Sequence, residues 1–134
     1  DCTTVAVLFD QYRQFYSQDT DPELAKDYIG KHLDNGSSVI FLAWSKDHNA
    51  LGFTQLYPAF CSVDASPIWI LYDLYVDATA RRLGVGKALM WPQSMQSRLA
   101  RRALTWKLRP ETPRLKYSMS RWAIVAIPIF ISTL

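Results

Sequence analysis

The most informative segment of the chain is IWILYDLYVDATARRLGVGKALM, residues 68–90. Residues 68–76 are apolar, aromatic and β-branched, a composition that predicts a strand buried on both faces. Residues 77–83 form a short polar connection with two arginines, and residues 84–90 begin a helical pattern of apolar positions. The segment therefore predicts a strand that leads through a glycine-rich turn into a helix.

The predicted turn has the properties of a phosphate-binding site. Gly84 and Gly86 have no Cβ, so the backbone there can come close to a ligand. The first turn of the following helix offers N–H groups without an intrahelical acceptor, and the helix dipole favours an anion at that end. Arg81 and Arg82 place positive charge beside these groups. We interpret the turn as a site for a phosphate or pyrophosphate group, with a tight turn that binds no ligand as the alternative.

Two common nucleotide-binding motifs do not fit this turn. A Walker loop needs glycine at position 81, where arginine stands, and serine or threonine at position 88, where alanine stands. The dinucleotide-binding fingerprint needs a third glycine at position 89, which is leucine. The pattern that remains is Arg81-x-x-Gly84-x-Gly86 after the predicted strand.

Two segments resemble the acetyl-coenzyme A motif of the GNAT N-acetyltransferase family. That motif is Arg/Gln-x-x-Gly-x-Gly/Ala after a strand of the type Asp-Leu-aromatic-Val. The matching segments are Asp73-Leu74-Tyr75-Val76 and Arg81-Arg82-Leu83-Gly84-Val85-Gly86. Arg82 stands where the family most often has glycine and Ala78 where proline is common, and neither change removes an N–H donor.

The resemblance implies a fold and a cofactor-binding surface. The implied fold is α/β (α+β), with a mixed, mainly antiparallel central sheet flanked by helices. Backbone amides of residues 81–87 are implied to bind the pyrophosphate of acetyl-coenzyme A, and the backbone of residues 74–76 to pair with its pantetheine arm. The implied cofactor-binding residues are Leu74, Tyr75, Val76, Arg81, Arg82, Leu83, Gly84, Val85, Gly86 and Lys87. Acetyl-coenzyme A is the expected co-substrate, and no metal is implied.

The resemblance also implies an N-acetyltransferase that acetylates a primary amine of a small molecule or peptide by direct attack on the thioester. Backbone N–H groups near residues 74–76 would polarise the thioester carbonyl. Asp73 is the candidate catalytic residue, because a carboxylate there could attract or deprotonate the amine. A capping or ion-paired carboxylate is the alternative, since Tyr72 stands where many relatives have glutamate. The tyrosine that often protonates the thiolate is not recognisable, and Asp77 is expected to bond amides of the turn.

Upstream of this segment, the residue spacing predicts two helices. The first begins at residues 1–4, and the second spans 23–33 with Asp21 as its N-cap. The expected packed positions of the second helix are Leu24, Tyr28, Ile29 and Leu33. By the resemblance, three aromatic residues at the end of the first helix lie near the acceptor, with ordinary packing as the alternative. They are Tyr12, Phe15 and Tyr16.

The remaining part of the first half predicts a β-hairpin. Its strands span residues 39–44 and 51–60, and the short connection makes them antiparallel. The whole chain has 134 residues, which suits a single domain. Its two cysteines lack metal-like spacing, which favours reduced thiols in a cytoplasmic protein. The longest apolar run, residues 122–131, is shorter than the roughly 20 residues that a membrane-spanning helix needs.

The resemblance ends abruptly after Met90, where an arginine-rich tail begins. Back-translating residues 104–126 and reading from the third base of each codon permits a segment that contains Leu-Tyr-Glu-Ser-Leu-Gly, which is similar to the missing part of the family's domain. We therefore hypothesise that residues from about 91 onward are a frame-shifted translation, and we expect residues 91–134 to be poorly ordered or irregular. Residues 122–134 are expected either to add a strand or to pack loosely. The family also has a strand before its first helix, so we expect a fold that is incomplete at both ends.

The charge distribution suggests two further alternatives. Residues 1–77 hold 4 Lys and Arg against 11 Asp and Glu, whereas residues 78–134 hold 11 against 1. The basic half could be a nucleic-acid-binding module that uses Arg98–Arg121. If the tail is frame-shifted, its charge is accidental and nucleic acid is not an expected partner. The chain could also be a non-catalytic protein that binds acyl-coenzyme A. We expect acetyl-coenzyme A and a small amine or peptide as partners, no membrane, and leave a homodimer open.

Overall fold

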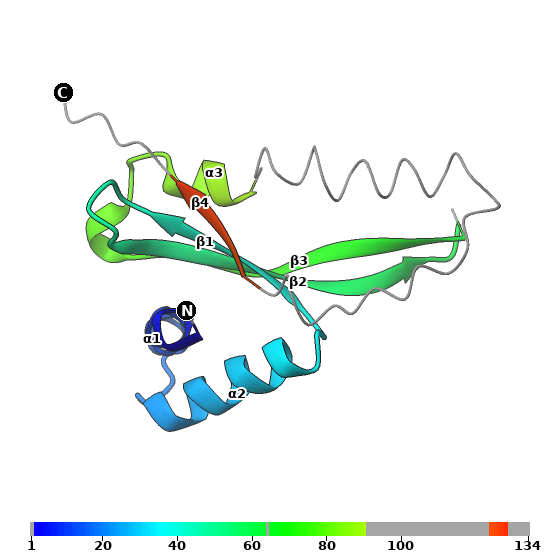
Figure 1. Ribbon diagram of the computed structural model, residues 1–134, viewed down its shortest axis with the longest axis horizontal. Coiled ribbons are helices and arrows are strands. Elements are labelled where there is room, and N and C mark those ends of the chain that lie inside the picture. The colour runs from blue at the N-terminus through cyan, green and yellow to red at the C-terminus, as the bar shows by residue number, and fades with distance from the viewer. Residues whose placement is uncertain (1, 64, 91–123, 129–134) are drawn as a thin grey trace.

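The computed structural model of the chain describes residues 2–63, 65–90 and 124–128. Two helices are followed by three strands, a short helix and a final strand (Figure 1). The elements are α1 Cys2–Phe15, α2 Pro22–Asp34, β1 Val39–Trp44, β2 Ala50–Cys61, β3 Ser66–Val76, the 3-10 helix η1 Ala78–Ala80, α3 Val85–Met90 and β4 Ile124–Pro128. The predicted helices and hairpin strands are confirmed to within two residues at nearly every end.

The sheet is mixed and mainly antiparallel, as predicted. Its strand order is β3-β2-β1-β4, with β2 antiparallel to both β1 and β3 and β4 parallel to β1. Helices α1 and α2 cover one face of the sheet, and α3 lies on the other (Figure 1). This arrangement puts the end of β3 between the two layers.

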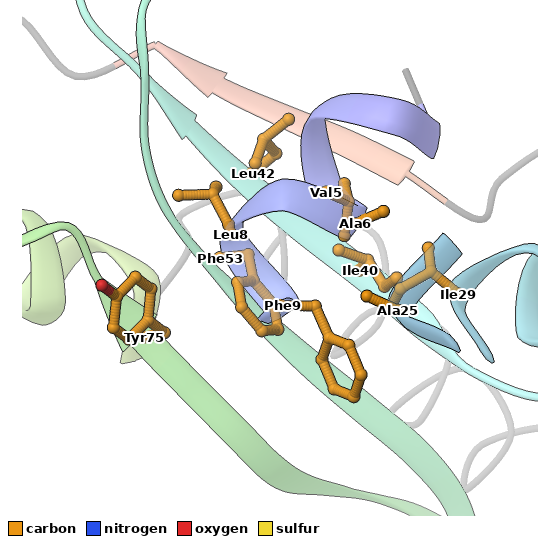
Figure 2. Close-up of a cluster of buried hydrophobic side chains, with 10 residues drawn as sticks. All are labelled: Val5, Ala6, Leu8, Phe9, Ala25, Ile29, Ile40, Leu42, Phe53 and Tyr75. Atoms are coloured by element: carbon orange, nitrogen blue, oxygen red, sulfur yellow. The ribbon is translucent and has the colours of Figure 1, made fainter. Parts of the chain in front are cut away.

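Each face of the sheet has its own core. The larger cluster lies between the sheet and helices α1 and α2, and Figure 2 shows its side chains converging from these elements. Its buried members are Val5, Ala6, Leu8, Phe9, Ala25, Ile29, Ile40, Leu42, Phe53 and Tyr75. The second cluster fixes η1 and α3 against the sheet. Its buried members are Phe41, Ala43, Leu51, Leu56, Ala80, Val85 and Leu89.

Helix α2 begins as predicted, and its packed face is confirmed at Ile29 and Leu33 but not at Leu24. The Asp21 carboxylate accepts a hydrogen bond from the Leu24 amide at 3.0 Å, which is the geometry of an N-cap. The buried residues of the helix are Ala25 and Ile29, which share one face at i, i+4 spacing. Leu24 is exposed, so its predicted packed position is wrong. The small side chain of Ala25 takes the contact with the core instead.

A buried carboxylate holds the connection between α1 and α2. The side chain of Asp10 accepts hydrogen bonds from the Asp21 amide at 2.9 Å, the Thr20 hydroxyl at 2.7 Å and the Gln14 amide group at 2.9 Å. The backbone N–H of Asp21 is the main cause that lowers the pKa of Asp10, against the opposing effect of burial. The connection is therefore anchored to α1 by an ionised side chain.

The prediction that residues 68–76 are buried on both faces is wrong for the first half of β3. Ile70 is 45% exposed and Tyr72 is 75% exposed. Within the described residues β3 pairs only with β2 and forms the edge of the sheet. The far half of the β2–β3 hairpin also extends beyond the helices (Figure 1). Only the end of β3, where Asp73 and Tyr75 are buried, lies over the core.

Most of the tail lies outside the described residues. The frame-shift hypothesis, the expected disorder of residues 91–134 and the nucleic-acid surface at Arg98–Arg121 therefore stay predictions. Residues 124–128 form β4, so an added strand is the outcome observed for this part of the tail. It runs beside β1 from the pair Ile40 and Ile124 to the pair Trp44 and Pro128. No helix among the described segments is long and apolar enough to span a bilayer.

Candidate functional site

The connection after β3 is fixed by hydrogen bonds to its own residues and to the sheet. The amide of Asp77 donates to the carbonyl oxygen of Leu51 at 2.9 Å, which continues the pairing of β3 with β2. The Asp77 carboxylate accepts from the Thr79 amide at 2.8 Å, so it bonds the turn as predicted. Hydrogen bonds from the hydroxyl and amide of Thr79 lower the pKa of Asp77. The turn therefore starts from a defined position at the end of the sheet.

The start of α3 presents backbone amides that no helical acceptor uses. The first hydrogen bond of the helix runs from the Ala88 amide to the Gly84 carbonyl at 3.1 Å. The amides of Val85, Gly86 and Lys87 precede that donor and lack an acceptor within the helix. Positive charge lies nearby on exposed side chains of the turn. The electrostatics of this end of α3 therefore favour an anion.

The two glycines of the turn have different structural explanations. Gly84 has a φ of +82°, a conformation that only glycine adopts without strain. Gly86 has no such φ, and a Cβ built there would meet only the Val76 Cγ2 atom at 3.7 Å, an ordinary contact. The fold therefore requires glycine at position 84 but not at position 86. A bare backbone at Gly86 is instead what a closely approaching ligand would need.

Arg81 joins the turn to the end of α1. Its Nε atom donates to the Val76 carbonyl oxygen at 3.2 Å. Its guanidinium carbon lies 5.5 Å from the centroid of the Phe15 ring, within the range of a cation–π interaction. Phe15 is exposed, so it provides a surface for this arginine and takes no part in the core.

Arg82 adopts a strained backbone conformation, with a φ of +64°. Replacing Arg82 with glycine is expected to raise the free energy of unfolding by about 0.5–1 kcal/mol, because glycine adopts this φ without the steric cost that arginine meets. Urea unfolding followed by circular dichroism measures the change. Arg81→Gly is the matched control: Arg81 has a φ of −69°, so its replacement is expected to lower stability. Equal effects of the two substitutions would contradict the assignment of strain to Arg82.

Asp73 lies on the face of β3 that is covered by α1 and α2. It is only 7% exposed, and its Oδ1 atom accepts a hydrogen bond from the Tyr12 hydroxyl at 2.9 Å. The Thr54 hydroxyl donates to its backbone carbonyl oxygen at 2.9 Å. Within the described part of the chain, Asp73 neither caps a helix nor forms an ion pair. The side chain is therefore held by a phenol rather than by a cation.

Burial is the main influence on the ionisation of Asp73. It raises the pKa of this carboxyl, and the Tyr12 hydrogen bond, His32 and the Tyr57 hydroxyl oppose the rise in decreasing order. Burial also raises the pKa of Tyr12, and its bond to Asp73 adds to the effect. Asp73 is thus a stronger base than an exposed aspartate.

A β-bulge separates Asp73 from the exposed half of β3. Asp73 is the partner of Gln55, and Leu71 is the partner of Leu56, so Tyr72 is an extra residue on β3. Bulges bend a strand and redirect its side chains, and they occur frequently beside active sites. The bulge therefore lies immediately before the residue that the sequence identifies as the catalytic candidate.

Four aromatic rings lie beside this bulge, on α2, β2 and β3. The hydroxyls of Tyr28 and Tyr57 are 2.8 Å apart and share a hydrogen bond. The Tyr57 ring lies 5.9 Å from that of Tyr72 and 5.3 Å from that of His32, and both pairs are edge-to-face. Alternation along β2 places Tyr57 on the same face as Gln55, the partner of Asp73. The sequence pattern gave no indication of this grouping.

A sequence model described as the acetyltransferase (GNAT) family matches residues 5–92. The chain belongs to the GNAT family. The match includes every predicted site residue, from Asp73 to Lys87.

The GNAT chain is also similar to curated proteins named as acetyltransferases. It is 43% identical over 90 residues to the uncharacterized N-acetyltransferase YhfO of Bacillus subtilis (strain 168). The matched region covers 67% of this chain and 60% of YhfO. It is 30% identical over 83 residues to a probable acetyltransferase of Haemophilus influenzae. This matched region covers 62% of this chain and 57% of that protein. The chain thus spans about three fifths of the length of these relatives.

Solved structures support the fold of the GNAT chain. The crystal structure of a probable acetyltransferase matches with a TM-score of 0.65 at 30% identity, and covers 86% of this chain and 87% of that one. A ribosomal-protein-alanine N-acetyltransferase from Brucella melitensis biovar Abortus 2308 matches with a TM-score of 0.58 at 20% identity, and covers 89% of this chain and 79% of that one. The second likeness concerns the fold alone. Together they confirm the α/β architecture that the sequence predicts.

The structure of the GNAT chain brings the predicted site residues into two adjacent groups. Residues 81–87 form the turn and the first turn of α3, and residues 74–76 lead directly into it. Asp73 lies on the opposite side of the sheet from α3, beside Tyr12 of α1. Over residues 2–63, 65–90 and 124–128, no three His, Cys, Asp or Glu side chains form a group that could hold a metal ion.

Proposed function

We propose that this chain is an N-acetyltransferase that transfers the acetyl group of acetyl-coenzyme A to a primary amine of a small molecule or peptide. Membership of the GNAT family supports the class of reaction. The observation that carries the proposal is the start of α3, where three amides lack helical acceptors beside a glycine that the fold itself does not require. Phosphate groups, including a diphosphate, commonly bind at such a start of a helix.

The carrier would lie along the end of β3. The amides of Val85, Gly86 and Lys87 would bind its diphosphate, and Arg81 and Arg82 would add positive charge. Within the described residues, one edge of β3 pairs with no other strand. The backbone of residues 74–76 could therefore form hydrogen bonds with an extended pantetheine arm, as a further strand would. This placement brings the thioester close to Asp73, the residue that precedes this stretch.

The reaction would follow direct attack. The neutral amine adds to the thioester carbonyl carbon, the carbon–nitrogen bond forms, and the carbon–sulfur bond breaks. Asp73 would receive the proton of the amine directly or through water, and the departing thiolate takes up a proton. Backbone N–H groups near residues 74–76 would stabilise the oxyanion. The raised pKa of Asp73 makes it a better base than an exposed aspartate, which favours this role.

Replacing Asp73 with asparagine is expected to lower kcat/KM for amine acetylation by roughly 10²–10⁴-fold, the usual contribution of a general base. Release of free coenzyme A thiol measures the rate. Because burial raises the pKa of Asp73 above the usual range of an aspartate, kcat/KM should fall as the pH drops through that raised pKa, and this fall should be absent in the variant. The exposed Asp47→Asn substitution in the β1–β2 turn is the control and should leave the rate unchanged.

The same substitution should not reduce stability at neutral pH. A raised pKa means that the folded state holds the proton more tightly than the unfolded chain. Ionised Asp73 therefore costs stability as the pH rises above its unfolded pKa, and asparagine removes that cost. A variant that loses activity together with its thermal transition would contradict the proposed role. Binding of coenzyme A without turnover of any amine would favour a non-catalytic acyl-coenzyme A-binding protein.

A further inference from the structure

Asp73 is a buried carboxylate without a cationic partner in the described part of the chain. Ion pairs lie elsewhere, between Arg13 and Asp10 and between Lys31 and Asp27. Burying an ionised group is costly unless it is paired, so a cation that reaches Asp73 would gain a strong interaction. The Tyr12 hydroxyl donates to Oδ1 at 2.9 Å, and the Tyr57 hydroxyl and His32 also act on this carboxyl. A carboxylate can accept several hydrogen bonds, so an ammonium group can bind Asp73 in addition to these partners.

The surface beside Asp73 is aromatic rather than charged. Tyr57 contacts the rings of Tyr72 and His32 edge-to-face, and the Tyr28 and His32 rings lie 4.5 Å apart. The polar atoms of this surface are largely engaged with one another: the Tyr28 and Tyr57 hydroxyls share a hydrogen bond, and His32 Nδ1 lies 2.6 Å from the Ser37 hydroxyl. The rings thus present their carbon faces and edges to a ligand.

The aromatic side chains at the rim of this surface are more exposed to solvent than the Asp73 carboxylate. Tyr72 is 75% exposed and Tyr28 is 36% exposed, whereas Asp73 is 7% exposed. The carboxylate therefore lies deeper than the rings beside it. A ligand that binds Asp73 through one end would rest its other end against the rings of Tyr57 and Tyr72.

We propose that the acceptor of this acetyltransferase is a small arylalkylamine, with its ammonium nitrogen at Asp73 and its uncharged ring against Tyr57 and Tyr72. This inference rests on the proposed function and specifies its substrate class. An ammonium group gains charge-assisted hydrogen bonds from the carboxylate, and an aromatic ring gains edge-to-face contacts with the tyrosines. Tyr57 and Tyr72 are specificity-determining residues in this arrangement, not catalytic residues.

The same arrangement disfavours an α-amino acid. Its carboxylate is only two bonds away from the amine nitrogen and would lie next to Asp73. Like charges at this distance repel, and no lysine or arginine of the described residues pairs with Asp73 to offset that repulsion. An alkylamine without a ring would keep the ammonium contact but lose the aromatic one.

Isothermal titration in the presence of free coenzyme A tests the inference without requiring turnover. The probes are phenethylamine, phenylalanine, which adds only a carboxylate, and n-butylamine, which lacks the ring. Phenethylamine is expected to bind at least ~10-fold more tightly than either of the others. Equal binding of the three, tighter binding of phenylalanine, or no binding of phenethylamine would overturn the inference.

Three variants test whether the Tyr72 ring causes the preference for phenethylamine. Tyr72→Ala should remove most of the preference for phenethylamine over n-butylamine, about a tenfold effect, and Tyr72→Phe should retain it. Phe60→Ala is the matched control, since Phe60 is an aromatic residue of the same hairpin that is 82% exposed. A Tyr72→Ala protein with an unchanged ratio of affinities would contradict the proposed subsite. A separate titration with coenzyme A distinguishes failure of this inference from failure of the proposed function. The proposed function predicts that coenzyme A binds, whether or not the aromatic subsite exists.

Discussion

A Gly86→Glu variant is expected to bind coenzyme A at least ~100-fold more weakly than the wild-type protein while remaining folded, because an added like charge next to a bound anion costs several kcal/mol. The glutamate would place its carboxylate at the start of α3, where the diphosphate is proposed to bind. The fold should tolerate it, since a Cβ at this position meets only Val76 Cγ2 at 3.7 Å. A carboxylate in the first turn of a helix is also electrostatically favourable. Calorimetric titration with coenzyme A measures the loss, and thermal unfolding verifies the fold.

The matched control for this experiment is Gly30→Glu in α2. Gly30 has no atom within 4 Å of a built Cβ, so the same side chain can be added away from the turn. The affinity of the Gly30→Glu variant for coenzyme A should equal that of the wild-type protein. Wild-type affinity in a folded Gly86→Glu protein would contradict the proposed position of the diphosphate. Loss of binding in both variants would indicate a general effect of charge and not a local one.

A Gly52→Ala variant is expected to lose about 3 kcal/mol of its free energy of unfolding, at the upper end of the usual cost of overpacking. A Cβ at Gly52 would overlap the Tyr75 carbonyl oxygen and lie 3.0 Å from the Val76 Cα atom. Both are backbone atoms of β3, the partner strand, so neither can rotate away as a side chain would. Relief requires the end of β3 to move from β2, and this end leads into the turn. Urea unfolding measures the stability, and coenzyme A titration measures the effect on the turn.

The Gly30→Ala variant adds the same methyl group but is expected to change the free energy of unfolding in the opposite direction. Gly30 lies within α2 and has open space around it, so alanine should stabilise the helix by about 0.5–1 kcal/mol. The two substitutions thus separate steric conflict from the general effect of adding a methyl group. A Gly52→Ala protein as stable as the wild type would show that β2 and β3 are not in the close contact described.

The elements that the sequence predicts well are those set by local rules. Asp21 and Pro22 mark the start of α2 through capping chemistry, and the hairpin follows from two largely apolar and aromatic runs separated by a polar turn. The strand, turn and helix from 68 to 90 are also specified locally, because the two glycines and the apolar spacing act within a few residues. The family resemblance rests on the same stretch, and the comparisons confirm it.

The features that the sequence does not predict depend on contacts between distant residues. The hydrogen bond from Tyr12 to Asp73 joins positions 61 residues apart, and helical spacing alone marks Tyr12 as an ordinary packing residue. The bulge at Tyr72 arises from the register of β3 against β2, which no single strand encodes. The exposure of the first half of β3 is a further example: its composition predicts burial, yet the strand stands at the edge of the described sheet.

Helix α1 contacts both halves of the proposed site. Phe15 lies under the Arg81 guanidinium at the turn. Tyr12, one helical turn earlier, donates a hydrogen bond from its hydroxyl to the Asp73 carboxylate. A ligand that shifts Arg81 therefore acts on the same rigid segment that positions the carboxylate. Thermodynamic linkage then requires any cooperativity between the two substrates to be reciprocal, with each changing the other's dissociation constant by the same factor.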